Sequence, residues 1–370
     1  MPKVTVLMSV YNGERFLCKA IESILGQTWK DFEFLIINDR STDNSKNIVL
    51  SFNDSRIRFL ENSSRKGLTK SLNRGLQLSH GELVARQDAD DVSHPTRLAR
   101  QILFLESHPE VVLLGSSARA IDDCSELKNV DLKMPTGLAA IRWYLMFHNA
   151  FIHSSVMFRR NIIINNLDGY NESFKRAQDY ELWSRLARDF VVENLSDILL
   201  DHRYEYGSIT SLMPLPSAAI EKVILNNLRV FLKDPAIPAE CAQFIMRFRR
   251  LDKFSRDTDW KHIAEMYQQT YEKYCLLYPE AESDQTIRSH LAGILYWIAY
   301  YAASGNRRVS FQTYVRAKKL APKINRHPCL ARYMALWIGG EGARCAYYRF
   351  GQRNRVDRNL QISRDEEKPY

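Results

Sequence analysis

Short apolar runs alternate with helical segments over the first 90 residues, and this alternation limits the fold more than any other feature of the sequence. The segments between the runs repeat apolar side chains at helical spacing. Such alternation is typical of a mostly parallel sheet with helices on both faces. The runs themselves are rich in apolar and β-branched residues and predict buried strands over residues 4–10, 32–37, 56–60 and 82–86.

Three carboxylates follow the fourth run directly, at Asp88, Asp90 and Asp91. The carboxyl end of a strand is where an α/β sheet places its ligands. Like charges crowded at such an edge disfavour one another's ionised form, and a divalent cation would remove that cost. Because Mg²⁺ and Mn²⁺ take oxygen ligands, the cluster predicts a site for one of them. An acidic turn whose side chains cap the next helix is the alternative that these residues leave open.

Glycine-rich phosphate motifs do not occur in the sequence. Neither G-x-G-x-x-G nor G-x-x-x-x-G-K-[ST] can be found, so a dinucleotide fingerprint or a Walker loop is not supported. A phosphate-binding site in this sheet would have to use a metal ion instead.

The rest of the chain changes in character past residue 200. From residue 220 onward the pattern is helical, and Pro214 and Pro216 interrupt it just before, so we expect a domain boundary at residues 208–219. This divides the chain into an α/β domain over residues 1–210 and a helical, basic region over residues 220–370. Before the boundary we expect a helix over 95–105, a strand over 111–121, a polar loop over 122–135, a strand over 154–158, a helix over 177–188 and short strands at 191–192 and 198–200.

Composition and charge indicate a cytoplasmic protein with a basic end. No signal peptide opens the chain, no apolar stretch approaches the roughly 20 residues that span a bilayer, and the six cysteines are scattered without a CxxC pair. The net charge is +9, yet residues 306–360 alone hold 13 Lys or Arg against two acidic residues. We expect this segment to favour an anionic membrane surface, with a solvated helical face as the alternative. Nucleic acid is not expected, because no recognised motif is present.

Five segments, taken in order, resemble the inverting nucleotide-sugar glycosyltransferases of family 2, which have the GT-A fold. This resemblance covers roughly residues 3–205 and implies a Rossmann-like, mixed and mostly parallel sheet, here followed by an α-helical C-terminal region. Two positions depart from the family pattern: Arg40 stands where Gly is usual, and Gln178 where Glu is frequent. The segments that carry the resemblance are residues 10–17, residues 27–28 with 34–43, the positions Asn62, Gly67 and Asn73, the DxD-like residues 88–91, and residues 178–183.

The resemblance implies a donor site in the first half of the chain. Asp39 would accept a hydrogen bond from the base, usually uracil, and Tyr11 would lie against that base. Asp88 would accept from the ribose or the donor sugar, while Asp90 and then Asp91 would hold Mn²⁺ or Mg²⁺. For Asp39 a helix-capping role stays open. The other implied residues are Asn12, Glu14, Lys66 and Ala89 for the donor and His202 as a possible further metal ligand.

The resemblance also implies how the chemistry would proceed. A divalent metal stabilises the departing nucleoside diphosphate, and a general base takes the proton of the attacking acceptor hydroxyl. Asp179, at the start of a predicted helix, is the candidate base, with simple charge complementarity at a helix N-terminus as its alternative. His153 and Trp183 are candidates for the acceptor side. The expected acceptor is a glycan or lipid-linked hydroxyl in cell-surface polysaccharide synthesis, and the expected donor is a UDP-sugar.

Two other functions remain open at this point. A metal-dependent nucleotidyltransferase also combines an α/β sheet with Asp-bound metal, although it has no need of the Asp179 segment. A non-catalytic module that binds a sugar nucleotide would need the donor residues alone.

Overall fold

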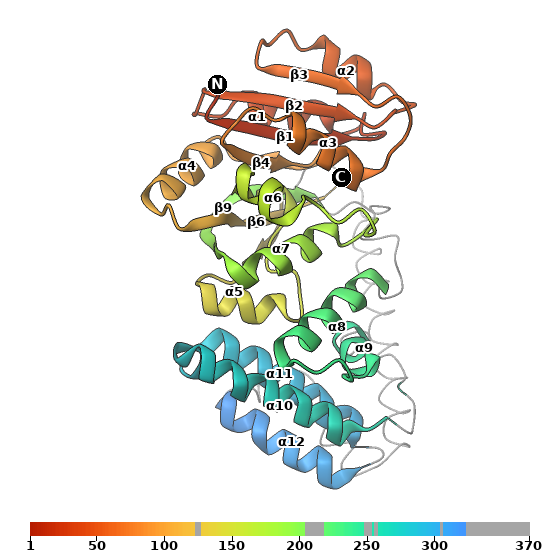
Figure 1. The fold of residues 1–370 in the computed structure, drawn as a ribbon, viewed down its shortest axis with the longest axis vertical. Helices are drawn as coiled ribbons and strands as arrows, with labels where there is room; N and C mark the ends of the chain where they lie inside the picture. The colour runs from red at the N-terminus through yellow and green to blue at the C-terminus, as the bar shows by residue number, and fades with distance from the viewer. Residues whose placement is uncertain (123–126, 204–217, 248–253, 255–257, 304–305, 323–370) are drawn as a thin grey trace, which may run out of the picture. The chain divides into compact units, whose positions relative to one another are not determined.

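One nine-stranded sheet organises the N-terminal part of the protein in the computed structural model (Figure 1). The strand order is β3-β2-β1-β4-β8-β6-β9-β5, with β7 paired to β6 off this path. Four N-terminal strands run parallel, and β6 and β9 are parallel to each other, so the predicted mostly parallel GT-A-like sheet is confirmed. The strands are β1 (Val4–Val10), β2 (Phe32–Asn38), β3 (Ile57–Glu61), β4 (Leu83–Gln87), β5 (Val92–Ser93), β6 (Val111–Ile121), β7 (Leu127–Leu132), β8 (Met157–Arg159) and β9 (Val191–Arg203).

The register of the central strands brings their carboxyl ends to one edge. Val10, the last residue of β1, pairs with Asn38, the last residue of β2. On the other side of β1, Met8 pairs with Gln87, the last residue of β4. The loops that follow these three strands therefore emerge side by side, which is where an α/β sheet places its ligands.

The first face of the sheet packs on helices α1 (Leu17–Leu25), α2 (Ser45–Ser51) and α4 (Arg97–Ser107). Side chains of a strand alternate between faces, and alternate residues of β1 belong to the same buried cluster as the apolar stripe of α1. This cluster includes Val6 and Met8 of β1 and Ile21 of α1, all fully buried. The helical spacing read from the sequence is therefore the spacing of the core.

The opposite face carries α3 (Leu68–Leu78), which packs on β1 and β2, and then α6 (Arg160–Leu167) and α7 (Gln178–Asp189). A methyl group at Gly75 would overlap the buried side chain of Leu7, which would have to move to make room, so the glycine favours this close approach of α3 to β1. The remaining elements of this unit are α5 (Leu138–Leu145), the 3₁₀ turn η1 (His153–Ser155), α8 (Ala218–Leu232) and α9 (Ala239–Arg247).

Several predicted elements differ from the structure beyond residue 120. Residues 127–132 form strand β7 instead of a loop, because β6 extends far enough to offer them a pairing edge. The two short late strands are one strand, β9, which stays paired to β6 across register shifts. The expected strand at 154–158 is the turn η1 followed by β8, and α6 was not predicted at all.

The chain forms two compact units, residues 1–246 and 247–370, and each is described by itself. The structure describes residues 1–122, 127–203, 218–247, 254, 258–303 and 306–322, with side chains from residue 130 onward in β7. The boundary predicted at residues 208–219 falls mostly outside these ranges and stays a prediction. So does the role of the basic segment 306–360, of which residues 323–360 lie outside the described part.

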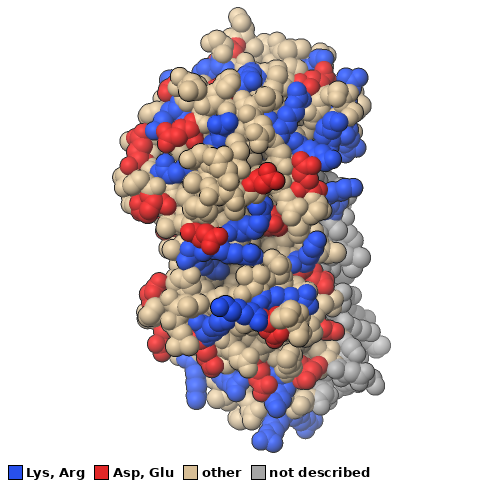
Figure 2. Space-filling model, in the orientation of Figure 1, with Lys and Arg blue, Asp and Glu red and all other residues tan. Residues whose placement is uncertain are grey.

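The described part of the second unit is helical, as predicted. Its described elements are α10 (Trp260–Leu277), η3 (Pro279–Glu282), α11 (Gln285–Ala302) and α12 (Arg307–Leu320). Asp259, Asp284 and Asn306 stand at the N-caps of α10, α11 and α12, and each side chain accepts from the first turn. Among the described helices of both units, none is long and apolar enough to cross a membrane. Figure 2 shows acidic and basic side chains interspersed over the drawn face.

Candidate active site

The loops after β1 and β2 are tied together by their own polar side chains. Asn12 has a left-handed backbone, with φ of 51°, and its Oδ1 accepts from the backbone N–H of Thr42 at 2.8 Å. Glu14 accepts from the backbone N–H of Asn44 at 2.9 Å, and its own N–H donates to Asp43 at 3.0 Å. The structure therefore gives Asn12 and Glu14, both expected beside the donor, a role in joining the two loops.

Asp39 is the most heavily bonded carboxylate of this edge. It is 2% exposed, and it accepts from Asn62 Nδ2 and the N–H of Lys66, both at 2.7 Å, and from the N–H of Gly67 at 2.8 Å. Lys66 and Gly67 lead into α3, so the carboxylate holds the entry of that helix. A carboxylate has about four lone-pair sites, which leaves one for a further donor.

Arg40 explains one of the two departures from the family pattern. Its φ is 64°, in the left-handed region that glycine occupies without cost. The fold therefore needs a glycine-like backbone at this position, and this chain meets the need with an arginine whose side chain lies 3.8 Å from Glu61.

Tyr11 and Arg65 form a stacked pair beside these loops. Tyr11 is 38% exposed, and the guanidinium carbon of Arg65 lies 3.9 Å from the centre of its ring. Such a pair presents a flat, positively charged surface, which suits a base or a phosphate. Lys66, expected beside the donor, joins the site through its backbone N–H, which donates to Asp39.

Asp88 meets a buried arginine. Its carboxylate accepts from Arg86, which is fully buried, and its backbone N–H donates to Ser154 Oγ at 2.9 Å. Burial would raise the pKa of Asp88, but the charge of Arg86, supported by that of His202, holds it below its usual value. Asp88 is thus an ionised acceptor with a fixed direction. Ala89 packs partly buried against the core cluster.

Asp90 is a carboxylate whose crowding is compensated only in part, by the charge of His202 and by its own backbone N–H. Burial, followed by the charges of Asp91 and Asp88, raises the pKa of Asp90 to about 7. Arg203, the last residue of β9, donates to the backbone carbonyl of Asp90 at 2.9 Å and so fixes the main chain without neutralising the side chain. A cation would relieve this crowding of like charges.

Asp91 lies deeper than Asp90 and is already paired. It is 1% exposed, accepts from the N–H of Arg203 at 2.8 Å, and lies 3.0 Å from His202 Nδ1. Burial would lower the pKa of His202, but the adjacent Asp91 outweighs burial and raises it to about 9. His202 is therefore protonated at neutral pH and serves as the ion-pair partner of Asp91.

A divalent metal fits Asp90 better than Asp91 or His202. Asp90 offers a hard oxygen ligand whose ionised form is disfavoured without a cation, whereas the other two groups satisfy each other. Within the described ranges, no three His, Cys, Asp or Glu side chains form a ready metal-binding group. The chain would thus supply one strong carboxylate, and donor phosphates and water commonly complete such a site.

Asp179 lies at the first turn of α7, as expected from the sequence. Its Oδ2 accepts from Asn149 Nδ2 at 2.7 Å, and the backbone N–H of Phe151 donates to Asn149 Oδ1 at 3.2 Å. The amide of Asn149 is therefore held from both sides and orients the carboxylate. Ala177, the N-cap of α7, has no polar side chain, so the first turn also gains from a carboxylate at Asp179.

His153 lies under the influence of carboxylates from both the expected donor side and the expected acceptor side. The charges of Asp179 and Asp88 both raise its pKa, while burial and Arg86 lower it more strongly. Trp183, also expected on the acceptor side, is fully buried, and its ring centre lies 6.2 Å from that of His153. Trp183 therefore supports His153 from within the protein and offers no surface to an acceptor.

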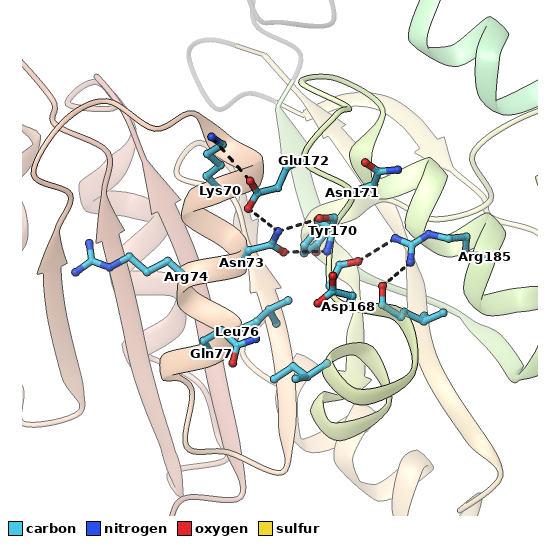
Figure 3. Close-up of a pocket in the computed structure, with 13 residues that line it drawn as sticks. Lys70, Asn73, Arg74, Leu76, Gln77, Asp168, Tyr170, Asn171, Glu172 and Arg185 are labelled. Carbon is cyan, nitrogen blue, oxygen red and sulfur yellow. Dashed lines mark hydrogen bonds and ion pairs between the residues drawn. The ribbon is translucent and has the colours of Figure 1, made fainter.

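A separate cavity lies beside this cluster, between α3 and the turn after α6 (Figure 3). Its volume is about 710 Å³, and Asn73, Tyr170 and Arg185 are among its lining residues. None of the residues expected from the sequence to bind donor or metal lines this cavity.

Sequence reasoning missed the residues that hold the site together. Arg86 stands two residues before Asp88 in the sequence, but no local pattern indicates that its side chain turns inward. Asn62, Asn149 and Arg203 act through contacts between distant segments, which no local motif marks. Only Asn62 was noted, as part of the family resemblance.

The sheet, its carboxylate-bearing edge and the helical unit that follows define a GT-A-like protein, and comparison with known proteins gives the family. The model of glycosyl transferase family 2 matches residues 5–167. The chain is 33% identical over 204 residues to the putative glycosyltransferase EpsE of Bacillus subtilis (strain 168), a match that covers 54% of this chain and 72% of EpsE. This chain therefore belongs to glycosyl transferase family 2 and is a glycosyltransferase.

The chain is also similar to a second glycosyltransferase in sequence and to a solved structure in fold. It is 32% identical over 204 residues to the amylovoran biosynthesis glycosyltransferase AmsE of Erwinia amylovora, covering 54% of this chain and 75% of AmsE. The crystal structure of S. aureus TarS 1–349 in complex with UDP-GlcNAc has a TM-score of 0.54 at 17% identity, covering 86% of this chain and 90% of that one. The second likeness is one of fold.

Proposed function

We propose that this chain is an inverting glycosyltransferase that moves a sugar from a nucleoside-diphosphate donor, a UDP-sugar, to a hydroxyl of a glycan or lipid-linked acceptor. The observation that carries the proposal is the arrangement around His153. Arg86 joins Asp88, at the end of β4, to His153, because its side chain donates to both. Trp183, one turn after Asp179 in α7, meets the same ring edge to face with the ring centres 6.2 Å apart. Two carboxylates of different expected roles, more than 90 residues apart in the chain, thus lie near one group, as a donor side and an acceptor side would require.

On the donor side, the chain would use a preformed frame and one unsatisfied charge. Asp39 has a lone-pair site left for a base N–H, and Tyr11 with Arg65 offers a flat cationic surface. Asp88, ionised and fixed by Arg86, would accept from a ribose or sugar hydroxyl. Asp90 would hold Mn²⁺ or Mg²⁺, which when bound stabilises the charge of the departing nucleoside diphosphate as a Lewis acid.

On the acceptor side, Asp179 would act as general base. One carboxylate oxygen is held by Asn149 at 2.7 Å, which leaves the other to accept the proton of an attacking hydroxyl. A positioned base contributes roughly 10²–10⁴-fold to rate. Attack from the face opposite the leaving group gives inversion at the anomeric carbon.

The relatives suggest which substrates to try first. AmsE is named for amylovoran biosynthesis, which supports an acceptor in cell-surface polysaccharide synthesis. TarS was crystallised with UDP-GlcNAc, so this is the first donor to test.

A panel of UDP-, GDP- and dTDP-sugars, assayed for release of the nucleoside diphosphate, tests the proposal. We expect one donor class to be hydrolysed or transferred with Mn²⁺ or Mg²⁺ and to be inert in excess EDTA. Asp90→Ala should lose this turnover, whereas Asp31→Ala, at an exposed carboxylate outside the site, should retain it. Release of sugar 1-phosphate from the donor, with the nucleoside monophosphate group transferred to an acceptor, would instead identify a nucleotidyltransferase. Donor binding without any turnover would identify a non-catalytic module.

We also propose peripheral association with an anionic membrane through the basic C-terminal segment. Its described part, α12, carries Arg307, Arg308, Arg316, Lys318 and Lys319 and no acidic residue. Its buried stripe includes Val309 and Ala317, and Phe311, 53% exposed, lies away from that stripe. Each basic residue near anionic lipid contributes about 1 kcal/mol. The protein should therefore float with anionic vesicles at low salt and be released at high salt; failure to float at low salt contradicts the proposal.

A further inference from the structure

The direction of Asp88 depends on how Arg86 is held. Besides Asp88, the buried guanidinium donates to the carbonyl oxygens of Leu7 and Gln87, at 2.7 and 2.8 Å. Its Nε donates to His153 Nε2 at 3.2 Å. Because a guanidinium is planar and its N–H groups form a rigid fork, these bonds fix the angle at which Arg86 meets Asp88.

His153 can accept from Arg86 only while its Nε2 carries no proton. Burial lowers the pKa of His153 and the charge of Arg86 lowers it further, so the ring is neutral. The hydroxyl of Tyr170 lies 3.0 Å from the same nitrogen, and the two rings meet edge to face. This arrangement makes Nε2 a shared acceptor and places the ring proton on Nδ1.

Tyr170 is in turn clamped by Asn73 of α3 (Figure 3). Asn73 Oδ1 accepts from the N–H of Tyr170 at 2.9 Å, and its Nδ2 donates to the carbonyl of Tyr170 at 2.8 Å. The preceding Gly169 has φ of 71°, and a Cβ there would lie 2.7 Å from Asn73 Oδ1, so this position requires glycine. Arg185 donates to the carbonyl of Gly169 at 2.9 Å and closes the turn from the other side.

We propose that Asn73, Tyr170 and His153 are positioning residues, a hydrogen-bonded relay that holds Arg86 and through it sets the carboxylate of Asp88 for the donor. This inference rests on the proposed donor site, because its outcome is the orientation of Asp88. The relay starts on α3, whose entry is held by Asp39. Helix α3 is thus linked to both donor-side carboxylates, to Asp39 directly and to Asp88 through the relay.

Tyr170→Phe tests the relay with a matched control. Thr270 is also fully buried, and its hydroxyl donates to the carbonyl of Met266 at 2.8 Å, in the second unit. Tyr170→Phe and Thr270→Val each lose one buried hydroxyl contact, and both should lower the melting temperature. Only Tyr170→Phe should lower kcat/KM for the donor, by about three- to tenfold, which corresponds to one neutral hydrogen bond. An equal loss in both variants would overturn the relay.

His153→Gln and His153→Leu test the acceptor role of Nε2. The Gln side chain keeps an oxygen that can accept from Arg86, whereas Leu leaves the buried Nε without a partner. Calorimetric titration with UDP-GlcNAc and Mn²⁺ should show at least tenfold weaker binding for the Leu variant, roughly the effect of an unsatisfied buried donor, and substantial rescue by Gln. Equal affinities of the two variants contradict the relay.

A measurement that needs no activity separates this inference from the proposed function. The ¹⁵N spectrum of the His153 ring should show a neutral imidazole with the proton on Nδ1, and the Nε2 signal should move in Tyr170→Phe but not in Thr270→Val. A proton on Nε2 overturns the relay whatever the enzyme does. The expected spectrum in a protein that neither binds nor turns over any nucleotide sugar supports the relay and overturns the proposed function.

Discussion

The loops after β1 and β2 and the acidic cluster after β4 lie at the same edge of the sheet, but they are built in opposite ways. In the loops, the side chains of Asn12, Glu14 and Asp39 are bonded to backbone N–H groups of neighbouring segments. In the acidic cluster, Asp90 is compensated only in part, and its pKa is raised to about 7. The chain thus completes the first region by itself and leaves the second in need of a positive charge.

This difference indicates which part of the site is structural and which is reserved for a ligand. A frame that satisfies its own hydrogen bonds keeps its shape before the donor arrives, and preorganisation of this kind lowers the cost of binding. A crowded carboxylate such as Asp90 destabilises the ligand-free protein, and this cost is consistent with a role in binding a cation. Substitutions in the two regions should therefore change stability in opposite directions.

Asp39→Asn should show the largest loss of stability. An amide at this position turns an NH₂ group toward a backbone N–H that the carboxylate now accepts, so a charge-assisted bond is replaced by a repulsive contact. We expect the free energy of unfolding to fall by about 2–4 kcal/mol. Chemical denaturation measures it, with Asp31→Asn, at an exposed carboxylate that accepts from the N–H of Lys3, as the matched control.

A change below about 0.5 kcal/mol in Asp39→Asn, equal to that expected for the surface control, would show that the loops are not held by this carboxylate. The contrast between the two regions would then fail on its structural side.

Asp90→Asn should raise the free energy of unfolding in the absence of metal, in contrast to the loss expected for Asp39→Asn. The pKa of Asp90 is about 7 in the folded protein and near 4 in an unfolded chain. The folded protein therefore binds the proton more tightly, and its free energy of unfolding falls as pH rises from about 4 through 7. Asn cannot ionise, and in EDTA the variant should be more stable near pH 8 by about 1–3 kcal/mol, with little difference near pH 4.

Melting curves with and without Mn²⁺ complete this test. The metal should raise the melting temperature of the wild type near pH 8 and leave that of Asp90→Asn unchanged. Equal stability of both proteins in EDTA near pH 8 would mean that Asp90 is well solvated and reserves no charge for a cation.

Arg40→Gly should give the smallest effect, a gain of about 0.5–1 kcal/mol. Glycine takes φ of 64° without the strain of a side chain, and the ion pair lost with Glu61 is half exposed and contributes little. Thermal unfolding of the variant beside Arg40→Lys, which keeps the strain, measures the gain. A stability loss in the Gly variant would show that the arginine side chain holds the loop.

Much of the fold could be predicted from the sequence, because buried apolar residues recur every second position in the strands and every three to four positions in the helices. Alternating apolar residues of β1 and the stripe of α1 form one buried cluster, and both were legible as patterns. The prediction failed where pairing depends on a distant partner, as in β7, whose polar sequence is a strand only because β6 extends beside it. The carboxylates of the site were visible for a similar reason, since each follows a strand or opens a helix.

The partners of those carboxylates could not be read from the sequence. Asn149 lies 30 positions before Asp179, and His202 lies 111 positions after Asp91, so no local pattern links them. Whether a side chain is exposed or buried also depends on the three-dimensional packing. Trp183 is a predicted acceptor contact in the sequence but is fully buried in the structure.

The Asp179→Asn variant tests the proposed general base most directly, when donor affinity and single-turnover transfer are measured on the same preparation. Asn keeps the shape and can still meet Asn149 through its oxygen, but it cannot take a proton. The groups expected to bind the donor, Asp39, Asp88 and Asp90, are untouched. We expect donor and metal affinities near those of the wild type, and a free energy of unfolding within about 1 kcal/mol of the wild type. Transfer should be slower by roughly 10²-fold or more. Transfer at a near wild-type rate would place the base elsewhere and contradict the assignment of α7 to the acceptor side.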